Sequence, residues 1–289
     1  MTPYDALVAP FVEYGFLKRA LVGCLILALG SAPIGVLLVV RRMSLVGDAM
    51  AHAVLPGAAI GFLFAGFSVA AMTLGGLAAG LAVAIAAGLV ARATALREDA
   101  SFAAFYLVSL AGGVLIVSLH GSNIDLLHVL FGTVLALNDP ALFLMASITS
   151  ITLIALALFY RLLIAESFDP AFLRLQGGGA FAHVLFLTLV VLNLVGGFHA
   201  LGTLMVVGLM MLPAAAARFW ADTLEWQIVT ATLAGMGSSY AGLLLSLHAD
   251  LPASPSIILS AGAFYLASVL FGPNESLLNQ LLKRQHLEA

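Results

Sequence analysis

The sequence predicts an all-α integral membrane protein, a polytopic bundle of about nine transmembrane helices, with eight as the other count that it allows. Three observations lead to this fold class. The 289-residue chain is 63% hydrophobic and only 9% charged, whereas soluble proteins carry about 25% charged residues. Its mean hydropathy is +1.14. Its charges are spaced so that stretches of 21 to 43 residues contain none.

The same composition excludes several other classes of protein. With so few charges, the chain does not fit a soluble domain, a disordered segment or a nucleic-acid-binding protein. Cys24 is the only cysteine, so the chain has no internal disulfide framework. The net charge of -3 is close to neutral and indicates no polyanionic partner.

The uncharged stretches predict the elements in order. A membrane helix needs about 20 apolar residues, so each stretch of 21 to 25 residues predicts one span and each stretch of 43 predicts two. The long stretches are expected to divide at turn-forming residues, 65–68 in the first and 196–199 in the second. The seven stretches are 20–40, 49–91, 100–124, 140–160, 175–217, 226–249 and 251–274.

The basic residues predict the orientation. With the turn at Arg41 and Arg42 in the cytoplasm, nine of the eleven Lys and Arg residues fall on that side, and only Lys18 and Arg19 lie outside. The N-terminus is therefore expected outside and the C-terminus in the cytoplasm. Eight spans result if one segment is re-entrant or if residues 1–16, which resemble an interfacial amphipathic helix, fold back.

Familiar soluble domains and catalytic motifs are missing from the sequence. The loops are short, so a single transmembrane domain is expected over residues 1–289, with 166–179 as its one sizeable cytoplasmic segment. The chain contains no GxxxxGK[ST], HExxH, GxSxG or CxxC motif. It is therefore not expected to bind ATP by a P-loop, to be an enzyme or to hold a cofactor tightly.

The most informative polar residues are Asp48 and His52, which lie four apart and so share one face of a helix. An ionised Asp near the bilayer centre costs about 2.5–3.5 kcal/mol, so it should face an aqueous path or the bundle interior. Carboxylate and imidazole together suit Mn²⁺, Fe²⁺ or Zn²⁺, and two copies on a two-fold axis would supply four ligands. Pro56 and Gly57 are expected to loosen the helix and to free backbone carbonyls. The spacing also fits a solvated aspartate at the interface and a histidine that only packs.

Other polar residues are weaker candidates. His199 is expected in the turn between the sixth and seventh spans. Its side chain could there be a metal ligand, or it could simply be solvated. His183 is expected at the cytoplasmic interface. The rest are typical of outer loops in contact with water: His120, Asp125, His128, His248 and Asp250.

Five segments form an ordered set of motifs: RRMSLVGDAMAHAVLPG (41–57), DLLHVLFG (125–132), SFDPAFLRLQG (167–177), ALGTLMVVGLMMLPAAAARF (200–219) and GLLLSLHADLPASPSI (242–257). The set resembles the permease subunits of bacterial ABC importers for Zn²⁺, Mn²⁺ and Fe²⁺, and the first motif is the most specific. Ala51, Leu173 and Ser254 depart from the family pattern, which usually has Ser, Ala and Gly at those positions.

The resemblance implies a type II-like permease in the bacterial plasma (inner) membrane. Two permease subunits, as a homodimer, would form the pathway, with Asp48 and His52 as a transient site for the transported ion. A cytoplasmic ATP-binding subunit would bind ATP and dock on the segment 166–179. An extracytoplasmic metal-binding protein would deliver the ion. The motif positions carried over for coupling are Asp169, Pro170, Leu173 and Gly177.

Two other classes compete with this interpretation. A proton- or sodium-coupled secondary metal transporter also places Asp and His in the membrane, but it tends to carry more ionisable groups and inverted repeats. An intramembrane enzyme needs a cluster of polar groups at one depth, and the sequence offers one pair.

Overall fold

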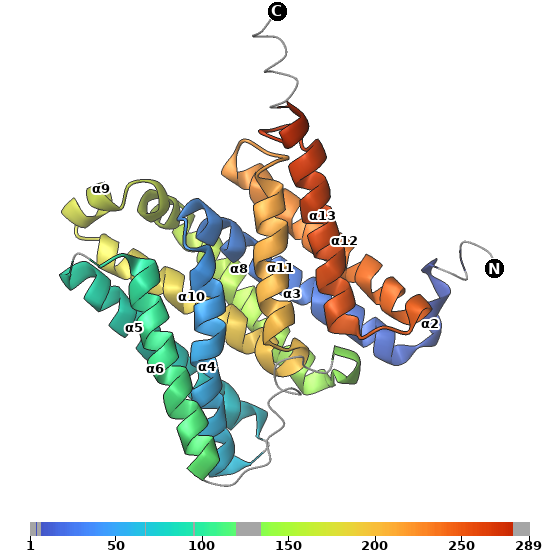
Figure 1. Ribbon diagram of the computed structural model, residues 1–289, viewed down its shortest axis with the longest axis horizontal. Helices are drawn as coiled ribbons and strands as arrows, with labels where there is room; N and C mark the ends of the chain where they lie inside the picture. The colour runs from blue at the N-terminus through green and yellow to red at the C-terminus, as the bar shows by residue number, and fades with distance from the viewer. Residues whose placement is uncertain (1–3, 5–6, 67, 95, 120–133, 280–289) are drawn as a thin grey trace, which may run out of the picture.

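The computed structural model describes Tyr4 and residues 7–66, 68–94, 96–119 and 134–279. Within these ranges the chain forms helices and no strands (Figure 1). The all-α prediction is therefore confirmed. The motif 125–132, with His120, Asp125 and His128, lies outside the described residues, as does the C-terminal segment 280–289.

Eight helices are long and apolar enough to cross a membrane, by length and composition. Each predicted span coincides with one helix, and the ninth is the 15-residue α11 (Thr203–Ala217). At 1.5 Å per residue α11 is about 22 Å long, shorter than a hydrocarbon core of about 30 Å. The eight long helices are α3 (Gly15–Val40), α4 (Ser44–Ala65), α5 (Val69–Ala93), α6 (Glu98–Leu119), α8 (Asp139–Phe168), α10 (Gly179–Leu201), α12 (Leu224–Ala249) and α13 (Ala253–Phe271).

Short elements join or extend these helices. They are α2 (Ala9–Glu13), the 3-10 helix η1 (Val134–Ala136) and α9 (Pro170–Leu175). The part of residues 1–16 that is described lies against α12, since Phe11 stacks on Tyr240 with ring centroids 5.2 Å apart. The Tyr240 hydroxyl also donates a hydrogen bond to the carbonyl of Leu7 at 2.8 Å.

The first predicted break is correct and the second is wrong. Gly66, with φ of 62°, ends α4 as expected. In the second long stretch α10 continues through 196–199, and the chain turns at Gly202, with φ of 85°. The reason is packing: a side chain on Gly196 would lie 2.7 Å from Ile148. That glycine lets two helices approach closely and does not form a turn.

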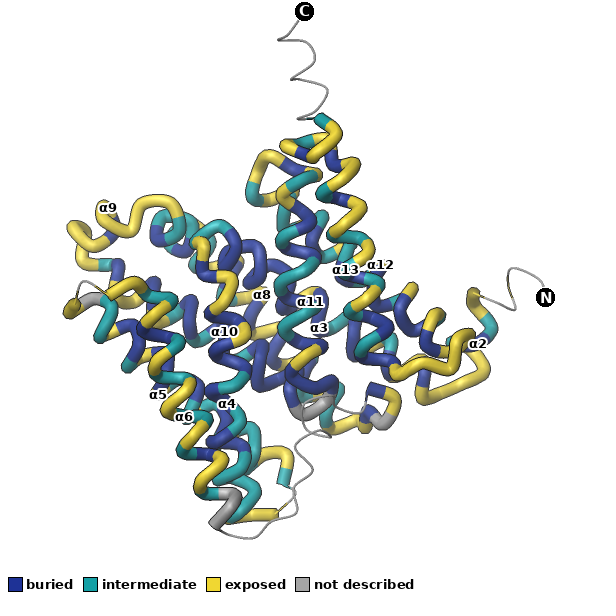
Figure 2. Tube along the Cα trace, in the orientation of Figure 1, coloured by how far each residue is buried: buried dark blue, intermediate teal, exposed yellow. Residues whose placement is uncertain are grey.

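The long helices form two groups around a buried centre (Figure 1). Helix α4 packs against α5 and α6, while α11, α12 and α13 pack against one another, and α11 and α12 also pack on α3. Helices α3 and α10 are the most deeply buried of the long helices, and the exposed residues lie on the outer faces (Figure 2). The predicted metal ligand Asp48 is on α4, outside this buried centre, and its side chain is exposed.

Close backbone contacts hold α4 against α5. A side chain on Gly57 would meet the carbonyl of Gly75, and one on Gly61 would meet the carbonyl of Ala71. Small residues at such crossings let helix backbones approach closely and pack by van der Waals contact. This contact matters inside a membrane because lipid tails are as apolar as the helices, so the hydrophobic effect does not drive the helices together. Pro56 and Gly57 do not interrupt the helix, because α4 is continuous from Ser44 to Ala65; the predicted free carbonyl follows from the missing N–H of proline.

Candidate functional site

Asp48 and His52 lie on one face of α4, as their spacing predicts. His52 Nε2 is 3.7 Å from Asp48 Oδ1. The Asp48 side chain is 62% exposed and the His52 side chain 31% exposed. The exposure of His52 does not fit a histidine that serves only to fill the core. Both side chains are available to an ion or to a second protein.

Helix α6 lies next to this pair. The rings of His52 and Tyr106 are stacked, with centroids 6.2 Å apart, and Ser109 Oγ donates to the carbonyl of Ala53 at 3.4 Å. One turn later Pro56 is buried. Because proline has no N–H, the carbonyl of His52 receives no hydrogen bond from position 56. Asp48 and His52 both precede Pro56, so their register is set by the helical turns before the proline.

Two ligands from one chain make an incomplete metal site. Within the described ranges no group of three or more His, Cys, Asp and Glu side chains could hold a metal ion. One carboxylate oxygen and one imidazole nitrogen suit a first-row divalent ion, but a stable site takes four or more ligands. The exposed position of the pair leaves room for ligands from outside this chain.

The segment 166–179, which is predicted to couple to the ATPase, is built by local capping. The Asp169 carboxylate accepts a hydrogen bond from the backbone N–H of Phe172 at 2.9 Å, which starts α9. Pro170 fits the first turn of a helix, where its missing N–H costs nothing. Gly177, with φ of 79°, ends the segment in a conformation that favours glycine. Leu173 is buried and packs beside Gly178, so it anchors α9 to the bundle.

The sequence reasoning missed three apolar side chains at this end of the bundle. Phe168, Phe172 and Leu175 are exposed on or beside α9. Helix α8 has 30 residues with a kink at Phe159. The part before the kink is about 30 Å long and already matches a hydrocarbon core of about 30 Å, so the turns after the kink extend beyond it. Exposed apolar side chains at such a position are typical of a surface for another protein. The available signal was that Phe168 and Phe172 lie outside the uncharged stretches and that Leu175 lies at the edge of one.

The other predicted histidines that the structure describes lie on helices other than α4. His199 is inside α10 and not in a turn, because the helix continues to Leu201. His183 lies near the start of α10, and its side chain is not in contact with water: its Nδ1 lies 3.6 Å from Glu166 Oε1, and its side chain is only 5% exposed. His248 is exposed, and its Nδ1 lies 2.8 Å from the carbonyl of Leu244. The recorded partners of His183 and His248 are therefore Glu166 and a backbone carbonyl, whereas Asp48 pairs with His52.

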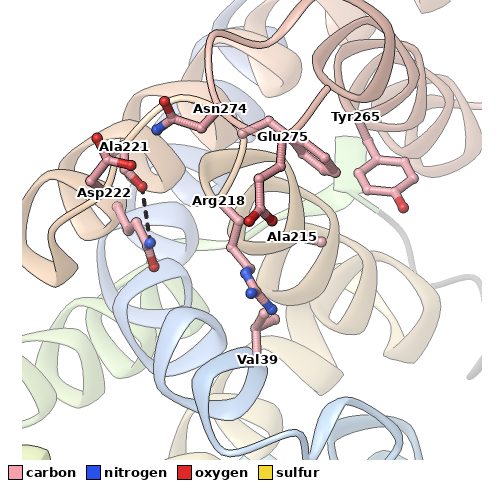
Figure 3. A pocket seen from close by; sticks show the side chains of 10 residues that line it. Val39, Ala215, Arg218, Ala221, Asp222, Tyr265, Asn274 and Glu275 are labelled. Carbon is pink, nitrogen blue, oxygen red and sulfur yellow. Dashed lines mark hydrogen bonds between the residues drawn. The ribbon is translucent and has the colours of Figure 1, made fainter. Parts of the chain in front are cut away.

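A separate recess of about 400 Å³ opens where α11 and α13 end, near Val39 (Figure 3). Its walls carry the oppositely charged side chains of Arg218, Asp222 and Glu275. Gln227 Nε2 donates to the carbonyl of Ala221 at 3.0 Å on one side. This mixed lining has no donor set for a transition metal.

A family model described as the ABC 3 transport family matches residues 13–272. The chain belongs to this family. The match covers all nine helices that correspond to the predicted spans. The chain is therefore a multi-pass permease subunit of an ABC transporter and not an enzyme, and ATP hydrolysis belongs to a separate subunit.

Curated relatives extend over nearly the whole chain. It is 29% identical over 273 residues to the manganese import system permease protein ScaB of Streptococcus gordonii, covering 94% of this chain and 96% of the relative. It is 32% identical over 269 residues to the manganese transport system membrane protein MntC of Listeria monocytogenes, covering 92% and 94%. Among solved structures, PsaBC from Streptococcus pneumoniae in complex with Fab matches with a TM-score of 0.82 at 28% identity, covering 94% and 98%.

Proposed function

We propose that this chain is the permease of an ATP-driven importer for Mn²⁺. The observation that carries the proposal is the combination of an exposed Asp48–His52 pair on α4 with relatives named as manganese permeases that match over nearly the full length. The donor set also binds Zn²⁺ and Fe²⁺. The names of the relatives favour manganese over these two ions.

Two copies of the chain complete the site in this proposal. The Asp48–His52 face of α4 is exposed in the single chain, and Leu45, at its beginning, is exposed as well. An exposed apolar residue beside two ligands is suited to a homodimer seam. Four mixed oxygen and nitrogen ligands, without a thiolate, would hold the ion loosely enough to release it, as transport requires.

The end of the bundle that carries α9 faces the cytoplasm in this proposal. In this orientation five arginines in turns or short segments next to the long helices lie on the cytoplasmic side: Arg41, Arg42, Arg97, Arg174 and Arg218. The positive-inside rule therefore supports this orientation in the bacterial plasma membrane. The ATP-binding subunit would dock on the exposed apolar side chains at α9. An extracytoplasmic metal-binding protein would deliver the ion to the opposite end.

The test is metal uptake by proteoliposomes that contain the permease and its ATP-binding subunit, supplied with the metal-binding protein. Uptake of Mn²⁺ is expected only with ATP inside the compartment that holds the ATPase. Uptake driven by a proton or sodium gradient without ATP would instead support a secondary transporter. Competition by Zn²⁺ and Fe²⁺ at equal concentration measures the preference, and Zn²⁺ or Fe²⁺ uptake in place of Mn²⁺ would overturn the assignment of the ion.

A further inference from the structure

A buried group of charged side chains lies where α3, α8 and α10 meet beside α9. Glu166 and His183 are 6% and 5% exposed, with Oε1 and Nδ1 3.6 Å apart. Arg41 Nε donates a hydrogen bond to Ser167 Oγ at 3.0 Å. The Arg41 guanidinium carbon also lies 3.9 Å above the ring of Phe186. These residues are neither the predicted metal ligands nor the residues that cap α9, so their role is still to be explained.

The positive charge of Arg41 is balanced by nearby negative charges. Burial lowers the pKa of Arg41 to about 10, and the negative charges of Glu166 and Glu98 oppose that shift. The guanidinium is therefore charged at neutral pH. Buried charges persist in proteins when they are paired, and removing one partner leaves the other uncompensated. The packing around the group is tight, since a side chain on Gly88 would lie 3.1 Å from His183 Nε2.

The position of Arg41 connects this group to the metal pair. Arg41 caps the end of α3, and Arg42, with φ of 58°, turns the chain into α4. Helix α4 begins at Ser44 and carries Asp48 in its second turn. A displacement of Arg41 therefore moves the first turns of α4, because only two residues separate it from that helix.

The positions of Glu166 and Ser167 connect the same group to α9. Both lie in the last turn of α8, and α9 begins at Pro170. Ser167 Oγ also donates to the carbonyl of Leu163 at 2.6 Å, which fixes its orientation for Arg41. His183 lies in the second turn of α10, after the segment that follows α9. Both ends of the coupling segment thus contact one buried cluster.

We propose that Arg41, Glu166, Ser167 and His183 form a positioning cluster that passes movement of α9 to the start of α4, and so to the Asp48–His52 pair. The proposal rests on the proposed function, in which an ATP-binding subunit moves α9. A rigid, charge-compensated cluster transmits such movement because its members separate only at the cost of leaving a charge buried without its partner. The cluster acts through α4 and does not bind the ion itself.

The test uses the complete complex with its ATP-binding subunit and the variant Glu166→Gln, which keeps the size of the side chain and removes its charge. Uptake of Mn²⁺ per ATP hydrolysed is expected to fall about tenfold, while ATP hydrolysis stays within about twofold of the unmodified complex. Ser167→Ala, which removes one hydrogen bond and keeps all charges, is expected to show a smaller loss. Arg42→Gln, a change at the exposed neighbouring arginine, is the matched control and should leave the ratio unchanged.

A second measurement does not depend on metal. Spin labels attached to cysteines introduced at the exposed positions Ser44→Cys and Ala171→Cys, in a Cys24→Ala background, report movement of α4 and α9 when ATP is added. Glu166→Gln is expected to keep the ATP-dependent movement at α9 and to lose the movement at α4. Equal movement at both positions, or an unchanged uptake-to-ATP ratio in Glu166→Gln and Ser167→Ala, would overturn the cluster's role. If the unmodified complex shows ATP-dependent movement at α4 but no Mn²⁺ uptake, the role of the cluster in passing movement is supported and Mn²⁺ as the transported ion is refuted.

Discussion

Neighbouring glycines of α6 provide a sharp test of the packing that supports α4. A side chain on Gly113 would lie 2.5 Å from Cβ and 2.6 Å from Cγ of Pro56. A side chain on Gly112 would meet nothing within 4 Å. The two positions are adjacent in one helix, so Gly112→Ala is a matched control for Gly113→Ala.

The expected magnitude follows from these distances. Carbon atoms in contact are normally about 3.5–4.0 Å apart, so α6 must move away from Pro56 by about 1 Å to accept the methyl group of Gly113→Ala. The proline ring cannot rotate aside as a flexible side chain does. Overpacking of this kind costs about 1–3 kcal/mol. Both substitutions gain the same helix propensity of about 1 kcal/mol, so the difference between them isolates the steric cost.

The assay is equilibrium unfolding of the purified permease in mixed micelles, titrated with a denaturing detergent and followed by far-ultraviolet circular dichroism. Gly112→Ala is expected to be as stable as the unmodified chain or more stable. Gly113→Ala is expected to lie about 1–3 kcal/mol below Gly112→Ala, with each 1.4 kcal/mol being about tenfold in the equilibrium constant. Equal stability of the two variants would refute the contact between α6 and Pro56.

Two further predictions concern hydrogen bonds. Asn193 Nδ2 donates to Thr152 Oγ1 at 2.9 Å between α10 and α8, so Asn193→Ala should cost about 0.6–1.7 kcal/mol. A cycle with Thr152→Val measures this by the same unfolding assay, and fully additive losses would contradict a direct bond. Asp169→Ala removes the side chain that accepts from the N–H of Phe172 and should destabilise α9 by about 1 kcal/mol. Weaker stimulation of the ATP-binding subunit is the readout, and full stimulation would count against the segment's role.

The positions of the helices were largely predictable from the charges. Charged groups are costly in a membrane interior, so they gather at helix ends and mark them. The break at Gly66 followed from turn chemistry, and the break at Gly202 did not, because Gly196 is used for close packing against Ile148. Sequence spacing does not distinguish a glycine that turns the chain from one that admits a neighbouring helix.

The candidate site was predictable only where it is local. The i, i+4 spacing placed Asp48 and His52 on one face, and the structure keeps them 3.7 Å apart. The pairing of Glu166 with His183 depends on how α8 and α10 pack, and no short-range pattern indicates it. Leu173 occupies a motif position expected to fit the ATPase, yet it is buried within the chain. Tertiary packing decides these cases.

The central claim is that a divalent ion passes the Asp48–His52 pair on its way through the membrane. The most direct test is ATP-driven uptake of radiolabelled Mn²⁺ by the reconstituted complex carrying Asp48→Ala or His52→Ala. Asp139→Ala, at an exposed carboxylate at the start of α8, is the control. Loss of one ligand is expected to lower uptake at least about tenfold in each ligand variant and to leave the control unchanged. Uptake at the unmodified rate in both ligand variants would contradict the account.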